Sequence, residues 1–248
     1  MGNPQTPPRE TIPVVEYVQS SFVPLSHLAH DWEFHSALTL SPSEERTMVR
    51  EPAEAVPAAI AQRLGKVRVL VVPYIACLET GDVITRLKPK GEAHTAAWVE
   101  APERINLLLA CRELDAHDTG FEFLGSVAEL LQARLADAEL AEYSRLLEEE
   151  VHQGVRGEID EEALHAKNAY LASLTGRRQR AHFERYRDVS FAGTAAEYIH
   201  GLWHDVQIRI GPDHLPVAQL RRRMNLMAKL FPPNPGYRVF DETVEATE

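Results

Sequence analysis

The chain has 248 residues, of which 44% are hydrophobic and 25% charged, enough to bury the core of one large domain or two small ones. Its formal net charge of −11 argues against general binding to nucleic acid or to an anionic membrane. The only cysteines, Cys77 and Cys111, lack CxxC spacing and are too few for a disulfide scaffold.

The composition also bears on localisation. The sequence has no apolar run of about 18 residues that would span a membrane and no basic-then-apolar leader. Two isolated cysteines in apolar contexts are typical of reduced, inert thiols. Since the chain is also rich in alanine, arginine and glutamate, we expect a cytoplasmic, bacterial protein.

The first part of the chain predicts a small β-sheet. Residues 1–12 are polar and rich in proline, so we expect a disordered tail. Residues 67–75 form the clearest strand, since they are β-branched and almost wholly apolar, which is typical of burial on both faces. After the turn at Thr80–Asp82, residues 83–87 are expected to return as a second strand, and residues 95–100 alternate as a third.

Several shorter elements surround this sheet. Residues 13–23 alternate weakly and indicate a strand, and the histidine-rich segment His27–His35 indicates a partly buried helix. Ser41, followed by proline and two glutamates, is typical of a helix start. Residues 57–64 predict a short amphipathic helix closed by Gly65.

From Pro102 onward the pattern is helical. Pro102 suits the first position of a helix, and Ile105, Leu108 and Leu109 would form its apolar face. Further helices are expected at 121–135, 137–156, 160–174, 195–208 and 216–231, before a frayed tail at 241–248. The sequence therefore predicts an α+β, mostly helical fold in a single globular domain, sheet-containing over residues 13–100 and helical over residues 101–240.

The segment Phe191–Asp205 holds the strongest metal-ligand candidates. We expect a helix to begin near Thr194, with Glu197, His200 and His204 on one face because they are spaced i, i+3 and i+7. One carboxylate and two imidazoles are a donor set for zinc or iron. Apolar residues form a different stripe, expected to face the core: Ile199, Leu202, Trp203 and Val206.

A structural interpretation of the same residues stays open. Thr194 and Glu197 have the spacing of a capping box, which would occupy Glu197 with the backbone and leave the histidines on a wet surface. Glu162-x-x-His165 repeats the spacing of Glu197-x-x-His200, and paired ExxH motifs hold di-iron centres in helical bundles. His165 is therefore a further candidate ligand.

Residues 152–160, HQGVRGEID, resemble the metal-binding helix of zincin-type metallopeptidases, whose gluzincin branch takes a third ligand, a glutamate, from a later helix. In this resemblance His152 matches the first ligand and Glu197 the third. Gln153 stands where the general-base glutamate belongs, and Arg156 stands where the second histidine belongs. Because a guanidinium stays protonated and cannot ligate zinc, the resemblance implies a zincin-like fold whose peptidase activity is lost.

These patterns lead to three functional hypotheses. The first is a zincin-like, catalytically degenerate domain that acts as a binding or scaffold module. The second is a helical metal-dependent enzyme using Glu197, His200 and His204, and the third is a metal-free helical interaction protein.

The cofactor is expected to be either none or one divalent ion, zinc or iron. No catalytic residue is predicted, and the candidate metal ligands are Glu197, His200, His204, His152 and His165. The expected partner is a protein or peptide, with no nucleic acid and no membrane, and the sequence predicts no oligomeric state.

Overall fold

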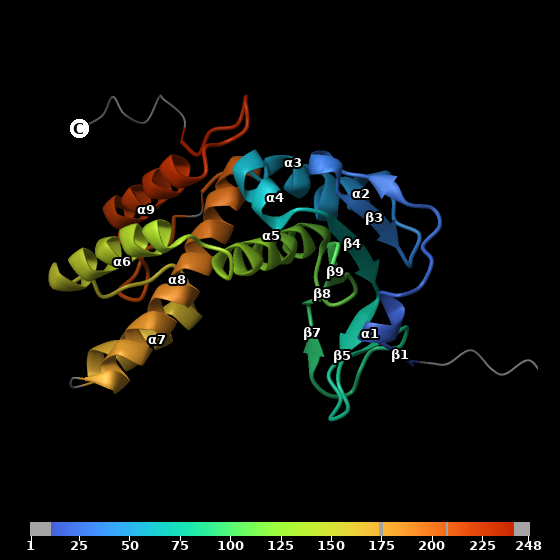
Figure 1. The fold of residues 1–248 in the computed structure, drawn as a ribbon, viewed down its shortest axis with the longest axis horizontal. Helices are drawn as coiled ribbons and strands as arrows, with labels where there is room; N and C mark the ends of the chain where they lie inside the picture. The colour runs from blue at the N-terminus through green and yellow to red at the C-terminus, as the bar shows by residue number, and fades with distance from the viewer. Residues whose placement is uncertain (1–10, 174–175, 207, 241–248) are drawn as a thin grey trace, which may run out of the picture. The chain divides into compact units, whose positions relative to one another are not determined.

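The computed structural model describes residues 11–173, 176–206 and 208–240 (Figure 1). Its chain contacts divide the described residues into two compact units. Unit 1 comprises the described residues up to Arg50 together with Gly65–Phe123, and unit 2 comprises Glu51–Leu64 and the described residues from Leu124 onward. Strand-forming residues continue beyond residue 101, since β9 covers Arg104–Ala110.

Unit 1 is built on a five-stranded sheet with the order β2-β3-β4-β9-β8. Its central strands β3, β4 and β9 are parallel, while β2 and β8 pair antiparallel at the two edges (Figure 1). The strands are β2 Ser26–His27, β3 Glu33–Ser36, β4 Val67–Val72, β8 Ala96–Ala101 and β9 Arg104–Ala110. The strand expected at 95–100 is confirmed, and β4 is almost wholly buried, as its apolar run predicted. The expected strand at 67–75 is divided at Pro73, since Val67–Val72 belongs to this sheet and Tyr74–Ala76 to another.

The helix predicted from Pro102 to Leu114 is wrong. Pro102 lies in the tight turn between β8 and β9, and Ile105–Ala110 is a buried strand that pairs with both β4 and β8. A short continuous apolar run fits a buried strand as well as a buried helix, so pairing with strands from elsewhere in the chain decides its state.

A second, smaller sheet in unit 1 is wholly antiparallel and has the order β1-β6-β5-β7. Its strands are β1 Thr11–Pro13, β5 Tyr74–Ala76, β6 Val83–Thr85 and β7 Ala93–His94. The chain passes from β1 directly into the short helix α1 (Val14–Tyr17), so the strand predicted over residues 13–23 is wrong. Of the predicted tails, residues 1–10 and 241–248 lie outside the described residues, while Thr11 and Ile12 belong to β1.

The histidine-rich segment His27–His35 is also not the helix that we expected. It forms β2, the 3-10 turn η1 (Ala29–Asp31) and β3, and the turn holds His30 and Asp31 at φ values of 62° and 57°. The turn places Trp32 in the core, where the side chain is 0% exposed and its indole N–H donates to the Gly65 carbonyl oxygen at 3.0 Å. Burial of this one large side chain overrides the helical spacing of its neighbours.

Short helices link the strands of unit 1 to unit 2. Ser41 closes a capping box with Glu44 at the start of α2 (Pro42–Glu45), as predicted, and the π-helical segment η2 (Arg46–Arg50) follows. In unit 2, α3 (Glu51–Ala55) precedes α4 (Ala58–Leu64), after which Gly65 takes a φ of 72°, also as predicted.

The remaining helices confirm that the fold is α+β and mostly helical. They are α5 Ala116–Gln132, α6 Asp137–His152, α7 Glu161–Ala172, α8 Arg177–Trp203 and α9 Val217–Leu230. Asp160 caps α7 by accepting from the Ala163 N–H at 2.8 Å. The helix expected at 121–135 begins earlier, because α5 already includes Ala116–Gly120. Among the described residues, no helix combines the length and apolarity that a membrane crossing requires.

Four helices of unit 2 meet around a buried network of charges. Arg223 of α9 is 0% exposed and donates to Glu150 of α6 at 2.6 Å and to Glu158, which precedes α7, at 2.7 Å. Lys167 of α7 lies 3.2 Å from the Glu158 carboxylate, and Tyr186 of α8 donates to it at 2.5 Å. The two acidic and two basic groups balance, so each buried charge has an opposite partner.

The network also fixes the backbone around Glu158. Its N–H donates to the Asp213 carbonyl oxygen at 3.0 Å, and its carbonyl oxygen accepts from the Leu215 N–H at 2.9 Å. A Cβ on the preceding Gly157 would lie 1.9 Å from the His214 carbonyl oxygen, so only glycine allows this approach. Arg223 belongs to the polar run Arg221–Arg223, yet it is central to the core because its partners come from other helices.

The pKa values of two carboxyl groups in this region shift in opposite directions. Burial alone would raise the pKa of Glu158, but Arg223, Lys167 and the Tyr186 hydroxyl outweigh it and lower the pKa to about 2. For Asp160, burial dominates over its hydrogen bond to the Ala163 N–H, so the pKa is raised from its usual value of 3.8.

We predict that Arg223→Met lowers the free energy of unfolding by roughly 3–5 kcal/mol, because it leaves two buried carboxylates with one cation. Its neighbour Arg222 pairs with Glu149 at the surface, with 43% of its side chain exposed, so Arg222→Met should cost about 0–1 kcal/mol. Denaturant melts of both variants measure the difference, and equal losses would contradict the buried network.

We also predict that the usual order of carboxyl titration is inverted, with Glu158 protonating at a lower pH than Asp160. Because the folded-state pKa of Glu158 is depressed, its contribution to stability is fully present above its unfolded pKa and is lost as pH falls toward about 2. Asp160 has the opposite sign, so its contribution becomes more favourable as pH falls. Carboxyl ¹³C NMR shifts across the acid range measure both, and a Glu158 midpoint above that of Asp160 would refute the assignment.

Candidate metal centre

The small antiparallel sheet of unit 1 carries two polar side chains at the ends of its central hairpin. Cys77 follows β5 directly, and Asp82 immediately precedes β6. Between them the chain turns at Gly81, whose φ of 112° favours glycine and whose N–H donates to the Leu78 carbonyl oxygen at 2.9 Å. The turn therefore returns Asp82 to the side of Cys77, as the sequence Thr80-Gly81-Asp82 predicted for the backbone.

The neighbouring strand β7 adds a histidine to this pair. Register places Ile75 of β5 opposite His94, and the Cys77 N–H donates to the Glu92 carbonyl oxygen at 3.0 Å just beyond the paired residues. The His94 Nε2 lies 3.6 Å from the Asp82 Oδ1. Three separate segments thus meet at Cys77, Asp82 and His94.

In the part of the chain that the structure describes, this is the one group of three His, Cys, Asp or Glu side chains whose ligand atoms all lie within 4.8 Å of one another. A thiol, a carboxylate and an imidazole are all donors that zinc accepts. Cys77 is half-buried, and the side chains of Asp82 and His94 are 35% and 51% exposed, so the group is reachable from solution.

The charge around the thiol is negative. Partial desolvation, Asp82 and Glu92 together raise the pKa of Cys77, so the metal-free thiol stays protonated at neutral pH. This agrees with the expectation that Cys77 is no nucleophile. The two carboxylates would attract a divalent cation, which would itself displace the thiol proton.

Sequence reasoning did not find this group. Cys77 was interpreted as part of an apolar strand, and Asp82 only as a turn residue. The spacing Cys-x₄-Asp-x₁₁-His matches no short ligand motif, because the three residues meet through strand pairing between β5 and β7 rather than along one helix. The signal that could have been used is the placement of Cys77 and Asp82 at the two ends of the predicted hairpin.

The predicted site in Phe191–Asp205 has a different structure from the one expected. No helix begins there, since α8 runs unbroken from Arg177 to Trp203, and the Thr194 hydroxyl lies 2.8 Å from the Tyr143 hydroxyl in the core. The capping box of Thr194 with Glu197 is therefore wrong. Glu197 and His200 are 7% and 1% exposed, with the Glu197 Oε1 lying 3.9 Å from the His200 Nδ1.

The face carrying Glu197 and His200 is thus buried, and the wet surface expected for it is wrong. Trp203, expected in the core, is only half-buried, and its indole N–H donates to Glu51 at 3.3 Å. Ile199 and Leu202 of the expected apolar stripe are buried at 0% and 6% exposure, so this part of α8 is buried on both faces. The second buried face follows from the packing of other helices against α8, which hydrophobic spacing does not reveal.

The other predicted ligands lie at the surface. His204 follows the last residue of α8 in an extended conformation, and its ring centroid is 5.8 Å from that of His200. His165 is an exposed residue of α7, and His152 is the exposed last residue of α6. Within the described residues, none of the five predicted ligands belongs to the group of three that converges at ligand distance.

The segment that resembles a zincin metal helix is not one continuous helix. Gln153 is the C-cap of α6 and Gly154 has a φ of 76°, so His152 and Arg156 do not lie one helical turn apart. The i, i+4 geometry that joins two ligands on one helix is absent at these residues. The resemblance itself stays a prediction.

Comparisons of the chain with protein-family profiles, with curated proteins and with solved structures find no match. The candidate metal centre therefore stands on its own geometry and on the chemistry of its donors.

Proposed function

We propose that unit 1 binds a divalent transition-metal ion, zinc by donor type, through Cys77, Asp82 and His94. The observation that carries the proposal is the convergence of three donors from three segments within 4.8 Å. Donor atoms around a tetrahedral zinc stand about 3.5 Å apart, given metal–ligand distances of about 2.0–2.3 Å. The His94 Nε2 and the Asp82 Oδ1 already lie near this spacing, 3.6 Å apart.

The position of the site favours a binding or scaffold role over hydrolysis. Sheet strands β5, β6 and β7 have three, three and two residues, so they bury little surface of their own. Cys77 and Asp82 flank the turn that joins β5 to β6. A bound ion would cross-link both sides of this turn to His94 of β7. Because His94 and Asp82 are partly exposed, the ion would exchange with solution, and Glu92 or a water molecule would complete its coordination.

The earlier hypotheses become alternatives to this site. A metal-dependent enzyme using Glu197, His200 and His204 would place the ion in unit 2, and a metal-free interaction protein would bind none. A zincin-like, catalytically degenerate module remains compatible with a binding role, but the loss of helix after His152 lends no support to a peptidase centre there.

We predict that the metal-free protein binds one equivalent of Co²⁺ with sulfur-to-cobalt charge-transfer absorption, which requires a thiolate ligand. Zinc should displace the cobalt and raise the melting temperature, since an ion at about 100 times its Kd stabilises the native state by about 2.7 kcal/mol. Cys77→Ala should abolish the absorption and the shift in melting temperature, and His94→Ala should weaken both.

Two control variants separate the alternatives. Cys111→Ala removes the other thiol and should leave binding intact, while a His200→Ala/His204→Ala double variant should also bind normally. Metal retained by Cys77→Ala but lost by the double variant would refute the proposal and support the enzyme hypothesis. No metal bound by the folded wild-type chain would favour the metal-free interaction protein.

A further inference from the structure

One face of the five-stranded sheet in unit 1 changes from apolar to polar along its strands. Leu70 of β4 and its partner Leu108 of β9 pack in the apolar cluster that includes Val14 and Phe22. Two residues earlier on the same strands, the face carries polar side chains instead. The register aligns Glu33 of β3, Arg68 of β4 and Asn106 of β9 in one polar row, which meets the apolar Val99 on β8.

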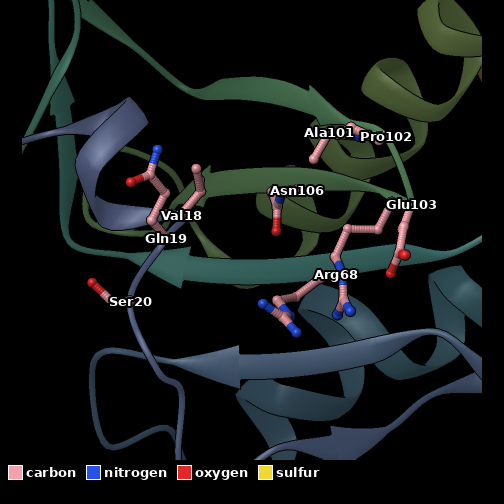
Figure 2. Close-up of a pocket in the computed structure, with 9 residues that line it drawn as sticks. Val18, Gln19, Ser20, Arg68, Ala101, Pro102, Glu103 and Asn106 are labelled. Carbon is pink, nitrogen blue, oxygen red and sulfur yellow. The ribbon is translucent and has the colours of Figure 1, made fainter.

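A cavity of about 450 Å³ opens beside this row (Figure 2). It lies between the β8–β9 turn and the residues that follow α1, and its volume is in the range of small-molecule sites. Figure 2 shows Asn106 in the middle of the lining, with Glu103 at the turn and Gln19 and Ser20 on the opposite side. The cavity is therefore lined by polar groups of both charges, with no metal ligand of the proposed centre among them.

Two guanidinium groups in the lining are fixed by one carboxylate. The Glu33 Oε2 accepts from the Arg68 Nε at 2.8 Å and from the Arg104 Nη1 at 2.7 Å, and the Arg68 Nη2 lies 2.7 Å away. The Arg68 guanidinium also lies over the Phe22 ring, 5.5 Å from its centroid. Because each guanidinium has five N–H donors, the contacts with Glu33 hold both groups in place and leave donors for a second carboxylate.

In the described part of the chain, the amide oxygen of Asn106 and the carboxylate of Glu103, both in the lining, lack partners. Asn106 is 3% exposed, and its Oδ1 accepts no hydrogen bond, while its Nδ2 reaches only the Val99 carbonyl oxygen at 3.5 Å. Buried amide oxygens are rarely left in this state, which points to a missing polar partner. Glu103, exposed on the turn, makes no ion pair or hydrogen bond within residues 11–173, 176–206 and 208–240.

We propose that this cavity binds a small zwitterion of the amino-acid class. Its carboxylate would bind the free donors of Arg68 and Arg104, its ammonium group would pair with Glu103, and the Asn106 carboxamide would turn to bond the ligand's polar atoms. A simple anion would leave Glu103 without a partner, and a simple amine would leave the guanidinium donors unused. The charges of both signs thus select a ligand that carries both.

The experiment screens each standard amino acid at millimolar concentration against the full-length protein by ligand-observed NMR. The strongest binder is then compared by calorimetry with its N-acetyl derivative, which lacks the ammonium group, and with its α-amide, which lacks the carboxylate. We expect each blocked analogue to bind about tenfold more weakly or worse. Failure of every amino acid to bind, or equal binding of a blocked analogue, would overturn the proposal.

Variants that remove one charge each test which residue binds the carboxylate of the ligand and which binds its ammonium group. Arg104→Gln should weaken binding of the zwitterion about tenfold, so that it no longer binds more tightly than the α-amide. In Glu103→Gln, the zwitterion should no longer bind more tightly than the N-acetyl derivative. Arg86→Gln is the matched control, since Arg86 is exposed in the same unit and lies outside the cavity lining. If Arg86→Gln weakens binding as much as Arg104→Gln does, while circular dichroism shows all variants folded, the ligand is held elsewhere and the proposal fails.

Discussion

The contact between Arg223 and the carboxylates of Glu150 and Glu158 is the constraint on which unit 2 depends. A fully buried guanidinium is tolerated only where its charge and its donors are matched, and here it is bound by residues of α6 and of the segment before α7. Lys167 and Tyr186 complete the coordination of Glu158 from α7 and α8. Four helices are therefore held in one register by directional bonds, in addition to apolar packing that is not directional.

Unit 1 distributes its polar groups in the opposite way. Its interior is apolar, with Trp32, the central strands β4 and β9, and the cluster around Leu70 and Leu108 excluding water. Its candidate ligand-binding groups lie at the turn of the small sheet, at Cys77 and Asp82, and on the inner strand β9, at Asn106. The Asn106 Oδ1 accepts no hydrogen bond from the described residues, and three possible ligand atoms converge around Cys77, which is why both are proposed as parts of ligand sites.

This contrast explains why the two candidate sites are placed in unit 1, although the sequence directed attention to unit 2. A buried polar group signals a ligand only when its bonds are incomplete. Glu158 has the most perturbed environment among the carboxylates, yet its partners all come from the protein, so its function is structural. Compared with Glu158, the group of Cys77, Asp82 and His94 is more exposed, and the Asn106 Oδ1 accepts no hydrogen bond from the described residues. These incomplete contacts support the two proposals.

The sequence by itself determined the elements whose signals are local. The apolar run at β4, the capping residues Ser41 and Asp160, the glycine after α4 and the mostly helical α+β class all depend on neighbours within a few residues. Tertiary structure decided what depends on partners distant in the chain. Ile105–Ala110 became a strand by pairing with β4 and β8, and Thr194 lies inside α8, with its hydroxyl 2.8 Å from that of Tyr143 in the core. It also buried Arg223, exposed His204 and gathered Cys77, Asp82 and His94 from three segments. Spacing along a sequence specifies which side chains share a face, whereas packing between elements specifies which face is buried and which donors meet.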